Sequence, residues 1–127
     1  MKNRLLGVAG AAAAVVLVSG SIWAHHSGAM YDSEHPITFK GVVTEFAFIN
    51  PHVQIHFEVK DEQGNSAIWI AGSAPPQRMY RAGWNKNTLK PGETITVTGA
   101  PAKDGSKVMS VRRLVGPSGQ VLSEGAE

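Results

Sequence analysis

Cysteine is absent from the 127 residues of this chain. Disulfide bonds and lipid attachment through an N-terminal cysteine are therefore excluded, and the folded domain must be held together by side-chain packing. The chain also lacks an excess of basic over acidic residues once its leader is removed. Without Lys2 and Arg4, which belong to the leader described below, ten of the twelve basic residues remain against ten acidic ones. A nucleic-acid-binding protein usually carries a basic stripe, so the sequence predicts no nucleic-acid partner.

Motifs for catalysis are also missing. The glycine-rich GxGxxG pattern of a dinucleotide site does not occur. Ser27 lies beside His26, but the sequence offers no third group to orient such a base, which a catalytic triad requires. These absences leave the question of enzymatic activity open and count against it, with a redox enzyme the weakest option.

The first 24 residues have the organisation of a secretory signal peptide. A positively charged start at residues 1–4 precedes an uncharged apolar run over residues 5–18, and the small residue Ala24 offers a cleavage point. We expect cleavage there, which makes His25 the mature N-terminus of a periplasmic or secreted protein with no membrane anchor. The alternative is an uncleaved anchor, because the uncharged stretch up to Trp23 is close to the ~17 residues that a membrane-spanning helix needs.

Residues 41–59 organise the rest of the chain as two strands and the corner between them. From position 52 onward, apolar and polar residues alternate with the period of two that gives a strand one buried and one exposed face. The apolar members are Val53, Ile55, Phe57 and Val59, and the polar members are His52, Gln54, His56 and Glu58. Asn50-Pro51 favours a corner over one long strand, since proline donates no ladder hydrogen bond and restricts the residue before it.

The other segments add strands and one helix. We predict further strands over residues 37–48, 67–71, 93–99 and 107–115. Gly41, inside the first of them, indicates a bulge or a sharp bend. A short helix is predicted between Ala74 and Ala82, after a proline-rich start and before Gly83, with Met79 facing inward.

Three strands, a helix and two strands is the order of the OB-fold, a five-stranded Greek-key barrel. The sequence thus predicts an all-β domain with one short helix, an OB-fold-like barrel over residues 37–115. It is preceded by an N-terminal arm (25–36) and followed by a flexible tail (116–127). An incompletely closed sheet and a small sandwich fit the same order.

Several short motifs point to one family. They include His25-His26-Ser27, Asn50-Pro51-His52, Trp69, Gly83-Trp84 and Leu89-Lys90-Pro91-Gly92. Together they resemble, over essentially the whole mature chain, a family of small exported bacterial proteins known only as a domain of unknown function. The resemblance implies no established activity. Where that pattern has a glutamate a few residues after Trp69, this sequence has Ala71-Gly72-Ser73, so a site that depends on the acid is missing here.

The five histidines suggest metal chemistry, because neutral imidazole is the commonest metal-ligating side chain. A mature N-terminus at His25 can chelate one ion through its amine and its imidazole, an arrangement similar to the histidine brace of copper proteins. His52 is the favoured third ligand and His26 a weaker candidate, a set that suits copper or zinc. His56 lies roughly 13 Å from His52 along a regular strand, too far to share an ion with it. The alternative is that these histidines are ordinary surface residues.

Aromatic residues are candidates for lining a sugar or peptide groove of the barrel. Four could do so, Trp69, Trp84, Tyr31 and Tyr80, and we single out the first three. Packing in the core is the alternative for each, given the area that an aromatic ring buries.

Two functions follow from the sequence. The first is a small exported OB-like binding or interaction protein for a peptide, glycan or protein partner. The other is a periplasmic copper- or zinc-binding protein that uses the N-terminal chelate, with the cofactor unknown and copper the candidate.

Overall fold

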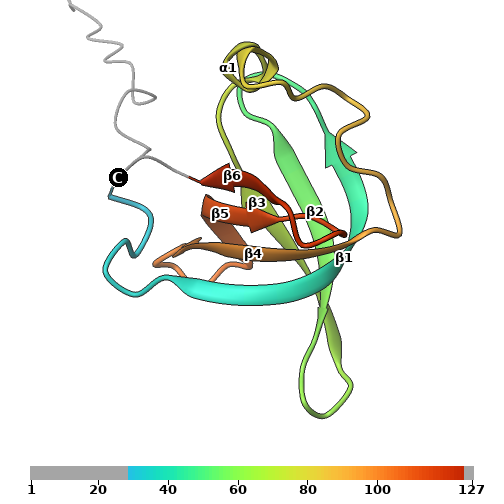
Figure 1. Cartoon of the computed structure of the whole chain (residues 1–127). Helices are drawn as coiled ribbons and strands as arrows, with labels where there is room; N and C mark the ends of the chain where they lie inside the picture. Colours follow the sequence, from blue (N-terminus) through green and yellow to red (C-terminus); the bar gives the residue numbers. More distant parts are fainter. Residues whose placement is uncertain (1–28, 125–127) are drawn as a thin grey trace, which may run out of the picture.

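The computed structural model describes residues 29–124 and contains six strands and one short helix. In chain order these are β1 (Ile37–Ala47), β2 (Gln54–Lys60), β3 (Ser66–Gly72), α1 (Pro76–Arg81), β4 (Thr94–Pro101), β5 (Val108–Val115) and β6 (Val121–Glu124). Figure 1 shows α1 at one end of the domain and the turn between β2 and β3 at the opposite end. Among the residues described, no helix is both long and apolar enough to cross a membrane.

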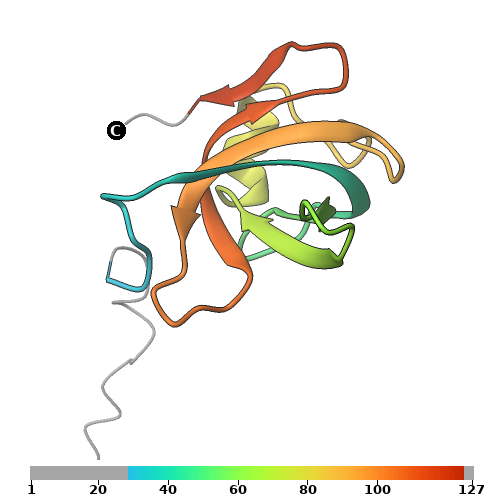
Figure 2. The same cartoon turned by 90° about the horizontal axis from the view of Figure 1, so that it is seen from below.

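The first five strands close into a barrel. The sheet order is β3-β2-β1-β4-β5-β6, and a parallel pairing of β3 with β5 brings the two ends of the five-stranded part together. Viewed at right angles to Figure 1, β1 and β4 run side by side through the barrel wall (Figure 2). The order of three strands, a helix and two strands confirms the predicted OB-fold-like barrel.

Strand β1 is shared between two partners, and Gly41 lies where it passes from one to the other. Residues 37–42 pair with β4, whereas residues 42–47 pair with β2, with a bulge between Val43 and Glu45. A Cβ atom at Gly41 would collide with the carbonyl oxygen of Glu58 and lie 2.8 Å from a ring carbon of Phe57. Only glycine permits this close approach, and the bulge next to it lets the sheet curl.

The barrel interior is filled by the apolar members of the strand alternation. Val43 and Ile55 are each 1% exposed and Phe57 is fully buried, as their period-two spacing predicts. Met79 of α1 and Leu89 of the following connection complete this cluster from outside the sheet. No polar or charged residue is buried among residues 29–124. The inward face predicted from the sequence is confirmed.

Residues 116–124 of the segment predicted as a flexible tail instead form a turn and the sixth strand, and residues 125–127 lie outside the described residues. β6 pairs with β5 beyond the part of β5 that pairs with β3. Leu122 packs against the core, and its carbonyl oxygen accepts a hydrogen bond of 3.2 Å from the indole Nε1–H of Trp84. A four-residue strand is too short for alternation to reveal it, and this tertiary hydrogen bond has no signature in the sequence.

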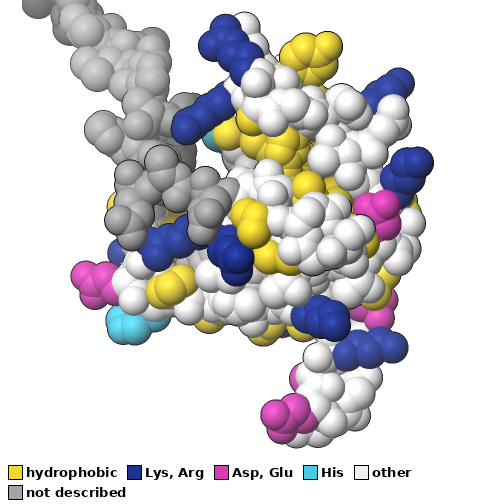
Figure 3. All heavy atoms as spheres, in the orientation of Figure 1, with side chains coloured by type: hydrophobic (Ala, Val, Ile, Leu, Met, Phe, Trp, Pro, Cys, Tyr) yellow, Lys and Arg dark blue, Asp and Glu magenta, His cyan; other side chains and the backbone are white. Residues whose placement is uncertain are grey.

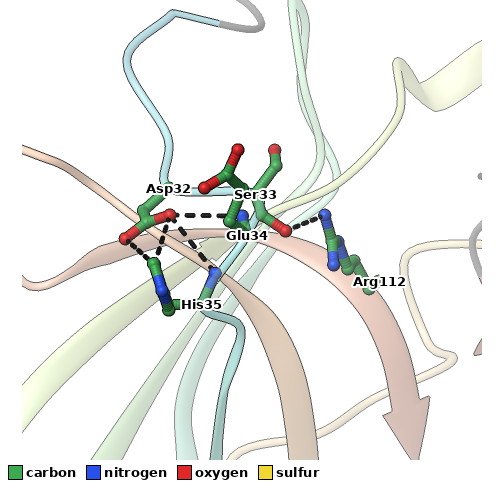
Figure 4. A network of polar contacts seen from close by, with 5 residues as sticks. All are labelled: Asp32, Ser33, Glu34, His35 and Arg112. Atoms are coloured by element: carbon green, nitrogen blue, oxygen red, sulfur yellow. Dashed lines mark hydrogen bonds and ion pairs between the residues drawn. The ribbon is translucent and has the colours of Figure 1, made fainter.

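The N-terminal arm is attached to the barrel from Tyr31 onward, and Figure 4 shows the contacts of residues 32–35. Tyr31 forms a bridge with Ala102, and the guanidinium of Arg112 donates to the carbonyl oxygen of Ser33 at 2.7 Å. The Asp32 carboxylate accepts a hydrogen bond from the backbone N–H of His35 at 3.2 Å and lies 2.9 Å from its ring Nδ1. The His35 side chain thereby holds the pKa of Asp32 below its ordinary value of 3.8.

Candidate functional site

The helix α1 presents its side chains to the core, to solvent and to two opposite flanks. Pro75 and Pro76 begin it, because proline lacks the N–H that a first turn leaves unpaired. Gly83 ends it with a φ of 91°, a conformation that glycine adopts at no steric cost. Met79 points into the core and is 6% exposed, whereas Tyr80 on the adjacent face is 69% exposed. With 3.6 residues per turn, Arg78 and Ala82 share one flank of the helix and Gln77 and Arg81 the other.

On the flank of Gln77 and Arg81 lies a shallow, wide-open apolar depression of about 480 Å³, here named the α1 hollow. Its lining consists of Phe48, Pro76, Gln77, Tyr80 and Arg81. Phe48 comes from the β1–β2 loop, and the next residue on that loop, Ile49, is 54% exposed. Tyr80 and Ile49 thus expose apolar surface on the two segments, α1 and the β1–β2 loop, that border the hollow.

Aromatic packing fixes the floor of the α1 hollow. The ring centroids of Phe46 and Phe48 are 6.1 Å apart in an edge-to-face arrangement, and those of Phe46 and Trp84 are 6.0 Å apart. Trp84 is 5% exposed and belongs to the barrel core. Phe48, which lines the hollow, is therefore connected to the barrel core through the ring of Phe46.

The surroundings of α1 are positively charged. Between residues 63 and 92 the chain contains no Asp or Glu, while it contains Arg78, Arg81, Lys86 and Lys90. Figure 3 shows Lys and Arg side chains around the α1 end next to exposed hydrophobic ones. In the part of the chain that the structure describes, no carboxylate forms an ion pair with Arg78 or Arg81. Within residues 29–124, these two arginines are therefore cations without a paired carboxylate.

Two of the three predicted metal ligands, His25 and His26, lie outside the described residues. The third, His52, is an exposed residue of the β1–β2 loop. His56 is half-buried on the outer face of β2, with its Nδ1 3.8 Å from a carboxylate oxygen of Glu45. Within residues 29–124, no three His, Asp or Glu side chains are grouped so that they could hold a metal ion. The chelate at His25 stays a prediction.

The three groove aromatics singled out from the sequence occupy separate surroundings. Tyr31 is on the arm, at its bridge with Ala102. Trp69 of β3 packs against Phe39, with the ring centroids 4.8 Å apart. Trp84 is buried beside α1.

The exposed ring of the α1 hollow is instead that of Tyr80, the aromatic left out of that selection. Neither Trp69 nor Tyr31 lines the hollow. The phase of the helix could have favoured Tyr80, because the residue after an inward Met79 points away from the core.

The strand order, the closure of β3 on β5 and the helix between β3 and β4 define an OB-fold-like barrel. The chain belongs to the DUF6152 family, a family of unknown function whose model matches residues 12–110. The predicted membership of a family of unknown function is confirmed. Export, the histidine motifs and a bacterial origin stay predictions. No curated protein matches the sequence.

Solved structures with a similar chain path include two crystal forms of Rim1, the mitochondrial single-stranded-DNA-binding protein of S. cerevisiae. At 10% and 11% identity they align with 72% and 73% of this chain and with 96% and 98% of their own, with TM-scores of 0.49 and 0.47. A crystal structure of TiaS in complex with a transfer RNA and ATP is similar at 15% identity and a TM-score of 0.44, over 67% of this chain and 18% of that one.

These structures correct one expectation from the sequence. Balanced charge predicted no nucleic-acid partner, whereas the proteins with a similar chain path include one that binds single-stranded DNA. The prediction is wrong, because balanced charge does not exclude a nucleic-acid partner. Single strands are bound partly by stacking of bases on aromatic rings, which the overall charge does not reveal. At 10% and 11% identity, this similarity does not assign a ligand to this chain.

Proposed function

We propose that this protein is a small exported binding module that takes up its partner in the α1 hollow. The partner is a peptide segment that presents an aromatic or aliphatic side chain next to an acidic one. The observation that carries the proposal is the 69% exposure of Tyr80 beside Phe48 and Pro76. Export rests on the signal-peptide pattern of residues 1–24.

The apolar lining supplies most of the affinity in this proposal. Removing apolar surface from water contributes roughly 25 cal/mol per Å², and partly exposed rings are the side chains that most often dominate binding energy at interfaces. Phe48 and Tyr80 offer such rings from two different segments, the β1–β2 loop and α1. The loop between the first two strands is also a common binding element of OB-folds.

The positive charge at the rim selects and orients the partner. A solvent-exposed ion pair contributes only about 0–1 kcal/mol, so Arg81 cannot by itself hold a ligand. Arg81 does favour acidic peptides in one orientation. An acidic residue next to the buried side chain is attracted to Arg81, and a basic one is repelled. The apolar contact therefore determines affinity and the arginine determines specificity.

A phage-displayed library of random heptapeptides, selected on the purified protein, tests this function. We expect enriched sequences that pair Trp, Phe or Leu with Asp or Glu. Binding of the selected peptide, measured by fluorescence anisotropy, should weaken at least tenfold in Tyr80→Ser, since interface tyrosines commonly contribute about 2 kcal/mol or more. Ile68→Ser, a matched change at a residue 47% exposed on the outer face of β3, should leave binding intact.

Two results overturn the proposal. One is a selection that enriches no sequence, or only sequences whose binding survives Tyr80→Ser. The other comes from a single-stranded oligothymidylate used as competitor. If it binds with an affinity that falls steeply with salt and is lost in Tyr80→Ser, the hollow is a stacking platform for nucleic acid and not a peptide site.

A further inference from the structure

A second hollow lies on the opposite flank of α1, between the helix and the strands β5 and β6. Its volume is about 480 Å³, within the range of small-molecule sites. In Figure 3, hydrophobic side chains are visible in the space between α1 and the strands below it. The first hollow is bordered by Arg81 and the second by Arg78, so the helix separates them. We name the second one the fork pocket.

The fork pocket exists because β3 and β6 share one edge of β5 and then diverge. β3 pairs with residues 108–110 of β5, while β6 pairs with residues 113–115. The space between the two is further widened by Gly72, which has no side chain and lies opposite Ser110 in the register. Trp84 holds the far wall in place through its hydrogen bond to Leu122.

The lining of the fork pocket combines apolar side chains with polar groups, and the polar groups make up the larger part of its accessible surface. Met79, Trp84 and Leu122 supply the apolar part. The polar side chains are those of Ser73, Ser110, Ser123 and Arg78. Ser73 donates a weak 3.4 Å hydrogen bond to the sulfur of Met79. Within residues 29–124, the hydroxyls of Ser110 and Ser123 and the guanidinium of Arg78 have no hydrogen-bond partner, so they are available to a ligand.

We propose that the fork pocket binds a small organic carboxylate with an apolar body. The guanidinium of Arg78 matches a carboxylate in a two-pronged pair, and serine hydroxyls donate to the same oxygens. One cation in the lining calls for one negative charge, because a second would be left unpaired in a partly enclosed space. The apolar body packs on Met79 and Trp84. This site does not depend on the peptide function, since it uses the other flank of the helix.

NMR titration with phenylacetate tests the fork pocket, with the indole Nε1–H signal of Trp84 as the reporter. We expect saturable shifts of that signal, and at least tenfold weaker binding of phenylacetamide, the uncharged analogue. Arg78→Gln should weaken phenylacetate binding by at least about tenfold as well. The matched control is Arg81→Gln, which removes the same charge from the other flank of α1 and should change the affinity less than twofold.

Filling the pocket gives an independent measurement. At Gly72 an added Cβ meets only the carbonyl oxygen of Met109 at 3.8 Å, and its φ is not positive, so Gly72→Val is expected to fold. Its side chain occupies the pocket and should abolish phenylacetate binding. Three results overturn the proposal: no shift up to the solubility limit of phenylacetate, equal loss in Arg78→Gln and Arg81→Gln, or undiminished binding in Gly72→Val. Equal loss would mean a general attraction of anions to this end of the protein.

Discussion

The barrel interior and the α1 end treat their apolar side chains in opposite ways. Inside the barrel Phe57 is fully buried and Ile55 is 1% exposed, whereas at the α1 end Tyr80 and Ile49 are 69% and 54% exposed. Apolar side chains stabilise the fold in the first region, and in the second we propose that they bind a partner. The position in the secondary structure, not the residue type, distinguishes the two.

The largest expected effect lies in the interior. Ile55→Asp places an unpaired carboxylate in the apolar core and should cost several kcal/mol of folding free energy, enough to unfold a domain of this size. Ile68→Asp is the matched control, because Ile68 is 47% exposed on the outer face. Thermal melts by circular dichroism compare them. Equal melting temperatures for the two variants would show that the inward face is assigned wrongly.

A smaller loss is expected where β1 passes over β2. Gly41→Ala pushes a Cβ against the Glu58 carbonyl and should destabilise the barrel by about 1–3 kcal/mol, as overpacking does. Gly72→Ala, where the added atom meets only one oxygen at 3.8 Å, should stay within about 0.5 kcal/mol of the parent. Urea denaturation of the two variants measures the difference, and equal midpoints would contradict the role given to Gly41.

The copper hypothesis predicts changes in Cu(II) affinity that leave the stability of the barrel unchanged. If the mature N-terminus at His25 chelates Cu(II) with His52, one extra alanine before His25 should reduce the affinity almost as far as His52→Ala does. His56→Ala should change it little. Isothermal titration calorimetry on the exported protein decides between these outcomes. Undiminished copper binding with the extended N-terminus would leave the histidines as ordinary surface residues.

The smallest effect concerns the arm. Because His35 lowers the pKa of Asp32 in the folded state, the pair contributes stability above the ordinary carboxyl value of 3.8. That contribution is lost as the pH falls below 3.8 through the folded pKa. Melting curves across this window should show a steeper acid loss for the parent than for Asp32→Asn, which lacks the titrating group. Identical pH profiles would mean that the contact between Asp32 and His35 does not stabilise the arm.

Much of the barrel was predictable because strand alternation is a local signal. The spacing of Val53, Ile55 and Phe57 alone indicates the buried face of β2. The order of strands and helix then indicates the OB-fold-like barrel. β6 was not predicted, since its four residues are too few for a pattern and are held by pairing with β5 and by the hydrogen bond from Trp84 to Leu122, contacts that residue spacing does not show.

The candidate site was harder to predict than the fold. Phe48 comes from a loop and Tyr80 from a helix of six residues, and the helix phase points Tyr80 outward without indicating which loop it meets. Their proximity results from how the barrel closes, which residue spacing does not show. Trp84, singled out for the groove, is buried, whereas Tyr80, left out of that selection, is exposed. By residue type alone, Trp84 and Tyr80 are both aromatic and cannot be told apart as buried or exposed.

The most direct test of the central claim is a map of the peptide contact surface. Titrating the selected heptapeptide into ¹⁵N-labelled protein should shift the backbone amides of Phe48, Ile49, Tyr80 and Arg81, and leave those of His56 and Ile68 on the outer face of β2 and β3 unchanged. Shifts centred on His56 and Ile68 would place binding on the barrel wall and contradict the function assigned to the α1 hollow.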